Sequence, residues 1–169
     1  MKTVFSGPVF SVESGMLREP GGVRARRDIV RHSGSVAILP VASDRSITLI
    51  RQYRCVFKKM VIELPAGRVD EGETSLQAAK RELREEVGLG AKKWERLMRI
   101  LPTPGFCDET VTLYRASGLY PSFAEPDPDE RIEIMSMPLG EALERVRRAQ
   151  IEDAKTAVAL LLEAARTAP

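Results

Sequence analysis

The chain has 169 residues, of which 43% are hydrophobic, and its 26 basic and 24 acidic side chains give a formal charge of +2. This length suits one domain, and the hydrophobic fraction is enough to fill a core. The near balance of charge gives no sign of a nucleic-acid partner. The longest purely apolar run, residues 157–162, is far too short to span a membrane.

The cysteines and the N-terminus bear on the compartment. Cys55 and Cys107 provide neither a disulfide framework nor the pair spacing of a metal site, which fits a reducing environment. The first 15 residues carry one Lys and an apolar run broken by Ser, Gly and Pro, so they do not resemble a signal peptide. We therefore expect a cytoplasmic protein.

Residues 1–32 alternate weakly in polarity and turn at a Pro-Gly-Gly sequence, residues 20–22. This pattern predicts a β-hairpin or meander ahead of the main fold. Its lone histidine, His32, is assigned no chemistry. A solvated strand face is one explanation for the basic character of the segment, which comes from Arg24, Arg26, Arg27 and Arg31.

Two strands are expected next, at residues 35–41 and 46–51, with a turn between them. The second leads into Arg51, Tyr53 and Arg54. Guanidinium groups at a strand end can clamp a phosphate through paired hydrogen bonds, and an aromatic ring can stack on a base. The alternative for Arg54 is a surface ion pair.

A helix is predicted from about residue 75 to Gly88. Thr74 and Gln77 form a capping box, and Gly88 suits the left-handed conformation that ends a helix. Apolar residues recur at steps of three or four along this segment, so one stripe is expected to face a core. The stripe consists of Leu76, Ala79, Leu83 and Val87.

A neighbouring stripe of the same helix carries Glu82, Glu85 and Glu86. At this spacing the carboxylates point into one small volume, where their repulsion is costly unless a cation or a strong hydrogen-bond partner is present. Oxygen ligands without nearby His or Cys favour Mg²⁺ or Mn²⁺ over Zn²⁺. The alternative is a solvated helix face on which Glu85 pairs with Arg81.

The stretch from Gly67 to Leu89 resembles the Nudix box, G-x5-E-x7-R-E-U-x-E-E-x-G-U, where U is a bulky aliphatic residue, and it matches every fixed position. The resemblance implies an α/β/α sandwich with a mixed sheet. It also implies a metal-dependent hydrolase that acts on a nucleoside diphosphate linked to another moiety. The family's metal ligands correspond to Glu82, Glu85 and Glu86, and the residues that orient these acids correspond to Glu73 and Arg81.

The runs RQYR, residues 51–54, and ELPAG, residues 63–67, are similar to those of the ADP-ribose pyrophosphatase branch of the Nudix hydrolases. In that branch the residue matching Arg54 contacts substrate, and the carbonyl of the residue matching Ala66 helps to hold a metal. Arg51, at the same strand end, is a second candidate for substrate binding. The implied reaction is Mg²⁺-dependent hydrolysis of ADP-ribose to AMP and ribose 5-phosphate, with Mn²⁺ as a substitute. The alternatives are a GDP-sugar, another nucleoside diphosphate sugar, a dinucleotide, or a catalytically silent ADP-ribose sensor.

Downstream of the box, a strand at residues 94–101 leads into LPTPGFCDE, where prolines and a glycine force a tight loop. From the sequence alone this is also an ordinary turn. The resemblance implies that Pro104 and Gly105 shape the pocket for the terminal ribose, with Glu109 nearby.

A strand at residues 110–117 is followed by an acidic, proline-rich loop. Taken alone, such a charge run is a solvated surface loop. In families like this one, a loop at this place supplies the general base. Glu130 is the first choice for that role, and Glu133, in a strand at residues 132–134, is the second.

Two helices close the chain. The first is amphipathic, with an apolar stripe of Leu139, Ala142, Leu143 and Val146. Asp153 caps the second, at residues 154–166, which is expected to turn Val158, Leu161 and Leu162 toward the core.

These elements suggest two parts: a β extension at residues 1–34 and a Nudix hydrolase domain at residues 35–169. In similar families such an extension packs against, or is exchanged with, a second subunit and contributes to its pocket. We therefore expect a homodimer that binds a small-molecule substrate and has no nucleic-acid or membrane partner.

Overall fold

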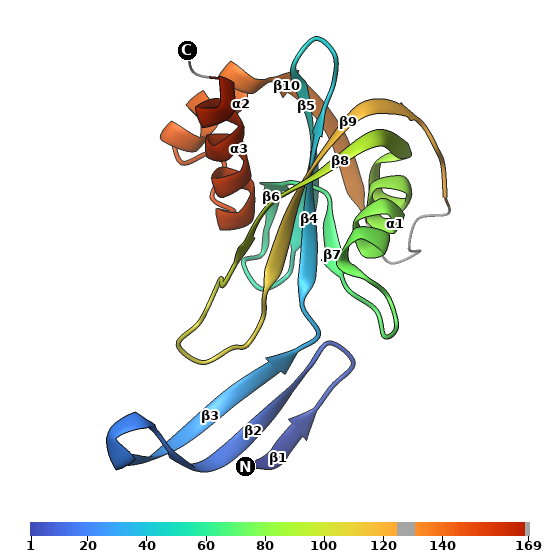
Figure 1. Ribbon diagram of the computed structural model, residues 1–169. Helices are drawn as coiled ribbons and strands as arrows, with labels where there is room; N and C mark the ends of the chain where they lie inside the picture. The colour runs from blue at the N-terminus through green and yellow to red at the C-terminus, as the bar shows by residue number, and fades with distance from the viewer. Residues whose placement is uncertain (125–130, 168–169) are drawn as a thin grey trace.

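The computed structural model describes residues 1–124 and 131–167 of the chain. Two sheets are present, and the smaller, N-terminal one lies apart from the main body (Figure 1). Among the described residues, no helix has the length and apolar character needed to cross a membrane.

The N-terminal sheet is an antiparallel meander of β1 (Lys2–Ser6), β2 (Phe10–Arg18) and β3 (Arg24–His32). The predicted turn at Pro20–Gly22 is a short 3-10 segment, in which Gly21 has a φ of 80° that favours glycine. The end of β3 joins the main body, because Val30 exchanges backbone hydrogen bonds with Phe106 and Asp108 at 2.8 and 3.1 Å. The predicted β extension is confirmed.

The main sheet has seven strands in the order β10-β5-β4-β9-β8, with β6 paired to β5 and β7 paired to β4. β4 and β9 run parallel and the other pairs are antiparallel, so the sheet is mixed, as predicted. The strands are β4 (Ser35–Val41), β5 (Ser46–Arg54), β6 (Lys59–Glu63), β7 (Ala66–Arg68), β8 (Leu89–Ile100), β9 (Val111–Pro121) and β10 (Ile132–Pro138).

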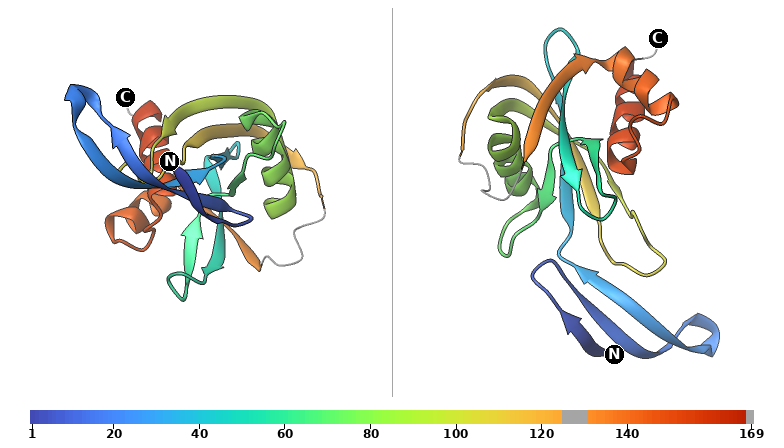
Figure 2. Two further views of the ribbon diagram at one scale, coloured as in Figure 1. Left: turned by 90° about the horizontal axis from the view of Figure 1, so that it is seen from below. Right: turned by 180° about the vertical axis from the view of Figure 1, so that it is seen from behind.

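Helices cover both faces of this sheet. Helix α1 (Ser75–Val87) packs on one face, and α2 (Leu139–Arg147) and α3 (Ala154–Thr167) pack on the other (Figures 1 and 2). Side chains of β4 alternate between the two cores: Val36 belongs to the α1 cluster and Leu39 to the cluster under α2 and α3. The predicted α/β/α sandwich is confirmed.

Strand β8 begins earlier than the predicted residue 94. Gly88 has a φ of 66°, and this left-handed residue turns the chain from α1 directly into the strand at Leu89. Gly90 lies so close to Tyr120 of β9 that a Cβ there would come within 2.5 Å of the ring. Gly and Lys are poor strand formers, so the sequence pattern concealed this first part of β8.

The prediction that Leu161 faces the core is wrong. Leu161 is 55% exposed, whereas Ala159 and Leu160 are fully buried. The buried stripe of α3 also includes Glu163, which accepts hydrogen bonds from Arg115 Nε at 2.9 and 3.0 Å. The apolar run at residues 157–162 has no helical periodicity, so the sequence does not show which of its side chains face the core.

Candidate active site

Helix α1 is fixed at both ends, and this fixes where its acids point. The Gln77 amide N–H donates to Thr74 Oγ1 at 3.3 Å, and the Thr74 amide N–H donates to Gln77 Oε1 at 2.8 Å. The Gly88 N–H closes the other end by donating to the carbonyls of Leu83 and Arg84. The predicted caps are therefore present, and the helix presents Glu82, Glu85 and Glu86 toward β7 and the segment after it.

Strand β7 lies against two of these acids. The Ala66 N–H donates to Glu86 Oε2 at 2.8 Å. Next to it, a Cβ placed on Gly67 would come within 1.9 Å of Glu82 Oε1, so only glycine leaves room for this carboxylate. Glu82 and Glu86 are both buried. The close approach of backbone and carboxylates is the central geometric feature of the site.

Arg81 connects the acids to the loop before the helix. Its guanidinium bonds Glu73 at 3.1 and 3.2 Å, Glu82 at 2.7 Å and Glu85 at 3.1 Å. The hydrogen bond to Glu73 is the largest cause of a raised Arg81 pKa, and the same bond lowers the pKa of Glu73. We call Glu73, Arg81, Glu82, Glu85 and Glu86 the box cluster. Of the two residues predicted to orient the acids, Arg81 bonds Glu82 and Glu85 directly, and Glu73 bonds Arg81.

The donor set of the box cluster fits a small divalent cation. Its three helix carboxylates offer only oxygen atoms, and one of them, Glu86, contacts the backbone N–H of Ala66, the residue whose carbonyl was predicted to help hold a metal. The cluster holds four carboxylates and one cation, Arg81, so its formal charge is negative, and a bound cation would offset that charge. Within residues 1–124 and 131–167, no three His, Cys, Asp or Glu side chains converge closely enough to hold a metal as they stand. Glu82 and Glu85 instead bond Arg81.

A cavity of about 320 Å³ is lined in part by all three residues of β7. We call it the inner cavity. It brings together three of the residues predicted to bind metal or substrate, namely Arg54, Ala66 and Glu109. Glu109 accepts a hydrogen bond from Ser35 Oγ at 2.9 Å. Pro102 lines this cavity, whereas the predicted Pro104 and Gly105 lie further along the same loop and do not.

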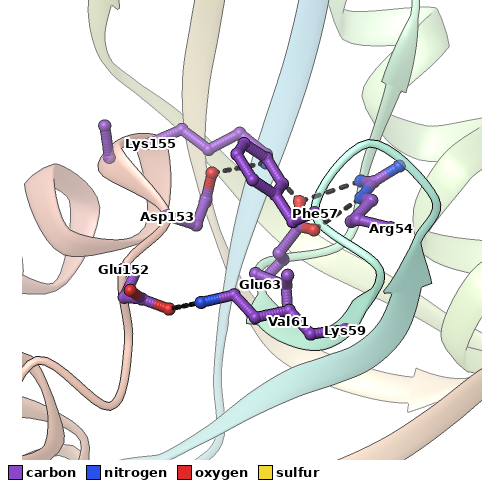
Figure 3. Close-up of a pocket in the computed structure, with 9 residues that line it drawn as sticks. Arg54, Phe57, Lys59, Val61, Glu63, Glu152, Asp153 and Lys155 are labelled. Carbon is purple, nitrogen blue, oxygen red and sulfur yellow. Dashed lines mark hydrogen bonds and ion pairs between the residues drawn. The ribbon is translucent and has the colours of Figure 1, made fainter.

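Arg54 is held by a buried acid. Its Nε and Nη2 donate to the two carboxylate oxygens of Glu63 at 2.6 and 2.8 Å (Figure 3). Glu63 is only 3% exposed. Burial alone would raise the Glu63 pKa, but hydrogen bonds from Arg54 and the charge of Lys155 outweigh it and hold this pKa below its usual value. The ion pair considered for Arg54 is thus present, with a buried partner.

Arg51 and Glu133 pair with each other rather than with the box cluster. They are direct neighbours on β5 and β10, and Arg51 Nη1 bonds Glu133 Oε2 at 3.1 Å. The adjacent Ile132 packs in the α1 core, so Glu133 points to the opposite face of the sheet from the helix acids. Glu130, the first choice for general base, lies outside the described residues.

Sequence reasoning missed the role of Glu63 and its second partner. Lys155 Nζ donates to Glu63 at 2.5 Å and to Asp153 at 2.8 Å. The available signal was a single charge between Ile62 and Leu64 in an apolar strand, since such a charge must be paired if it is buried. The predicted cap Asp153 is confirmed, because it accepts from the Thr156 N–H at 2.9 Å.

The sandwich and the carboxylate-bearing helix define the class of Nudix hydrolases. A family model described as the NUDIX domain matches residues 31–159, so the chain belongs to this family.

Two curated relatives and one solved structure are similar over most of the chain. The methanol dehydrogenase activator of Bacillus methanolicus is 36% identical over 159 residues, covering 93% of this chain and 86% of that protein. The ADP-ribose pyrophosphatase of Bacillus subtilis has the same identity and coverage. The crystal structure of an ADP compounds hydrolase superposes with a TM-score of 0.82 at 30% identity, covering 95% of this chain and 88% of that one.

The contact between Gly67 and Glu82 predicts the effect of adding one methyl group. Gly67→Ala should lower the free energy of unfolding by about 1–3 kcal/mol, because the new Cβ forces the buried carboxylate or β7 to move. Gly105→Ala is the control, since nothing lies within 4 Å of its Cβ position, and it should change stability by less than about 0.5 kcal/mol. Urea unfolding measures both, and equal effects would contradict the close contact.

The lowered pKa of Glu63 predicts a pH dependence of stability. The folded pKa is below the unfolded value of about 4.3, so the contribution of Glu63 is present above that pH and is lost as pH falls through the folded pKa. Glu63→Gln should therefore remove part of the fall in stability below about pH 4. Urea unfolding from pH 3 to 7 checks this, and an acid limb as steep as that of the wild type would refute it.

Proposed function

We propose that the chain catalyses Mg²⁺-dependent hydrolysis of the pyrophosphate bond of ADP-ribose, giving AMP and ribose 5-phosphate. The observation that carries the proposal is the contact of Ala66 and Gly67 with Glu86 and Glu82, because it brings the backbone of β7 and two helix carboxylates to one place. Relatives named ADP-ribose pyrophosphatase, from Bacillus subtilis and Mycobacterium tuberculosis, support the choice of substrate.

The proposed metal ligands are the Ala66 carbonyl and the carboxylates of Glu82, Glu85 and Glu86. A Mg²⁺ ion bound there, or Mn²⁺ in its place, supplies charge neutralisation for the pyrophosphate oxygens and lowers the pKa of a bound water. Arg81 keeps the acids in orientation through its bonds to Glu82 and Glu85.

The inner cavity is the proposed place of the substrate's phosphate and ribose. Arg54 contributes a positive charge and N–H donors at its wall, and Ala66 lines the same cavity next to the box cluster. Glu109 is the proposed acceptor for ribose hydroxyl groups, since it also lines the cavity. Pro104 and Gly105 shape the loop beyond Pro102 in this proposal. In this proposal one bound ADP-ribose molecule extends along the inner cavity from Ala66 to Arg54.

The general base remains a prediction. Glu133 is exposed and paired with Arg51, so it would have to leave that partner to reach an attacking water. Glu130 therefore stays the first choice.

The sequence also supports a cytoplasmic location in this proposal. Cys55 and Cys107 are both free thiols, which persist in a reducing compartment.

A hydrolysis panel tests the reaction. ADP-ribose, GDP-mannose, UDP-glucose, NADH and diadenosine polyphosphates are incubated with the protein and Mg²⁺, and products are resolved by chromatography. ADP-ribose should give AMP and ribose 5-phosphate with the highest kcat/KM. Glu86→Gln should lower kcat by at least about 10²-fold, because it removes a charge needed in the transition state.

The matched control for the panel is Glu95→Gln, which alters an exposed acid on β8 that pairs with Arg166. It should keep wild-type rates. A higher kcat/KM for GDP-mannose than for ADP-ribose would make GDP-mannose the proposed substrate. Binding of ADP-ribose without any product would favour a sensor.

We also propose that residues 1–34 form a dimerisation unit distinct from the catalytic domain at residues 35–169. The N-terminal sheet leaves large apolar side chains in water, which is unusual for a free surface. Phe5 and Phe10 are half exposed and their rings lie 5.4 Å apart. Val4, Val9 and Met16 extend the same exposed set. A second copy of the chain is the proposed cover.

Sedimentation velocity tests the dimer. The wild type should sediment as a dimer at micromolar concentration, and Phe5→Asp combined with Phe10→Asp should shift it to the monomer, because charges are depleted at buried interface positions. Leu161→Asp is the control, because Leu161 is also an exposed apolar residue but belongs to α3 and not to the N-terminal sheet. A monomeric wild type would contradict the proposal.

A further inference from the structure

Figure 3 shows the residues that line a second cavity, of about 500 Å³. This cavity shares Arg54, Asp153 and Lys155 with the inner cavity. We call it the outer cavity. The shared wall carries the charged side chains of Arg54 at the end of β5 and of Asp153 and Lys155 at the start of α3. Glu63, at the end of β6, lines the outer cavity only and lies between these charges.

Glu63 is the centre of these charges. It bonds two cations, since Arg54 donates to both of its oxygens and Lys155 Nζ donates to Oε2. Lys155 is itself held by Asp153 Oδ1 at 2.8 Å. The Lys155 side chain is only 17% exposed, so this is a mostly buried chain of charges running from α3 to Arg54.

Stability alone does not account for this arrangement. Replacing buried charges by apolar groups of similar size is often neutral or stabilising, because desolvation offsets the attraction. The docking of α3 has its own contacts: Thr156 Oγ1 accepts from the Leu64 N–H at 2.8 Å, and Leu160 is fully buried. Lys155 therefore adds a charged contact to a helix that Thr156 and Leu160 already attach to the sheet.

The orientation of Arg54 is what the chain of charges controls. Nε and Nη2 of the Arg54 guanidinium both donate to Glu63, so the edge of the guanidinium that carries Nη1 points away from this carboxylate. Lys155 also offsets the charge of Glu63, so Arg54 retains a positive field toward the inner cavity. Without Lys155, the remaining Glu63, Asp153 and Arg54 would carry a net formal charge of −1 beside a site meant for an anion.

We propose that Lys155 is a positioning residue for phosphate binding: held by Asp153, it fixes the Glu63 carboxylate, which presents the free edge of Arg54 to a phosphate group in the inner cavity. This inference rests on the proposed function, because it takes a nucleoside diphosphate compound as the ligand. Lys155 acts through Glu63 and makes no bond to the substrate.

The first experiment compares Lys155→Met, Lys155→Arg and Lys59→Met. ADP-ribose binding is measured by calorimetry in EDTA, and kcat and KM are measured with Mg²⁺. Lys155→Met should raise Kd and KM about tenfold, the size expected for residues coupled in one network, while kcat stays within about twofold. Lys155→Arg should restore most of the affinity.

Lys59→Met is the matched control. Lys59 is another cation of the outer cavity, but it pairs with the exposed Glu152 and not with Glu63. Its loss should leave Kd and KM at wild-type values. Thermal unfolding of each variant separates affinity from stability: a Lys155→Met protein with a lower Tm and unchanged Kd would overturn the inference.

A double-mutant cycle with Glu63→Gln separates positioning from direct contact. If Lys155 acts through Glu63, Lys155→Met should add little to the loss of affinity already caused by Glu63→Gln. Additive losses would mean that Lys155 touches the ligand directly, which overturns the positioning role. A wild type that binds no ADP-ribose would overturn the proposed function and this inference together, whereas unaltered binding by Lys155→Met would overturn the inference alone.

Discussion

The contact between β7 and α1 is the constraint on which the rest of the site depends. Glu82 occupies the space that a side chain at residue 67 would take, and Glu86 accepts the N–H of Ala66. These acids can stay so close to one another because the capping box, Gly88 and Arg81 fix the helix that carries them. Gly67, which has no side chain, and the three acids of α1 thus define one small polar volume.

The segment from Glu63 to Ala66 is held from both faces of the sheet. On one side α1 bonds Ala66, and on the other α3 bonds Leu64 through Thr156 and Glu63 through Lys155. The two helices come from distant parts of the sequence, yet they fix the same short stretch of backbone. The proposed metal site and the proposed phosphate site therefore share one rigid support.

The sequence was most informative where a pattern is local. The Thr74 cap and the Gly88 end of α1 both follow from short-range patterns, and each was found in the structure. It was least informative where contacts are long-range. Glu63 bonds Lys155, which lies 92 residues away in sequence, and no local pattern records this pairing. The prediction that Leu161 faces the core failed for a related reason, because a continuous apolar run has no periodicity.

The most direct test of this account is Mn²⁺ binding, followed by electron paramagnetic resonance in the absence of substrate. Mn²⁺ stands in for Mg²⁺ with the same preference for oxygen ligands. The wild type should bind Mn²⁺, and Glu82→Gln and Glu86→Gln should each weaken binding by at least about tenfold. A wild type that binds no Mn²⁺, or variants that bind it as tightly as the wild type, would contradict the assignment of the box cluster as a metal site.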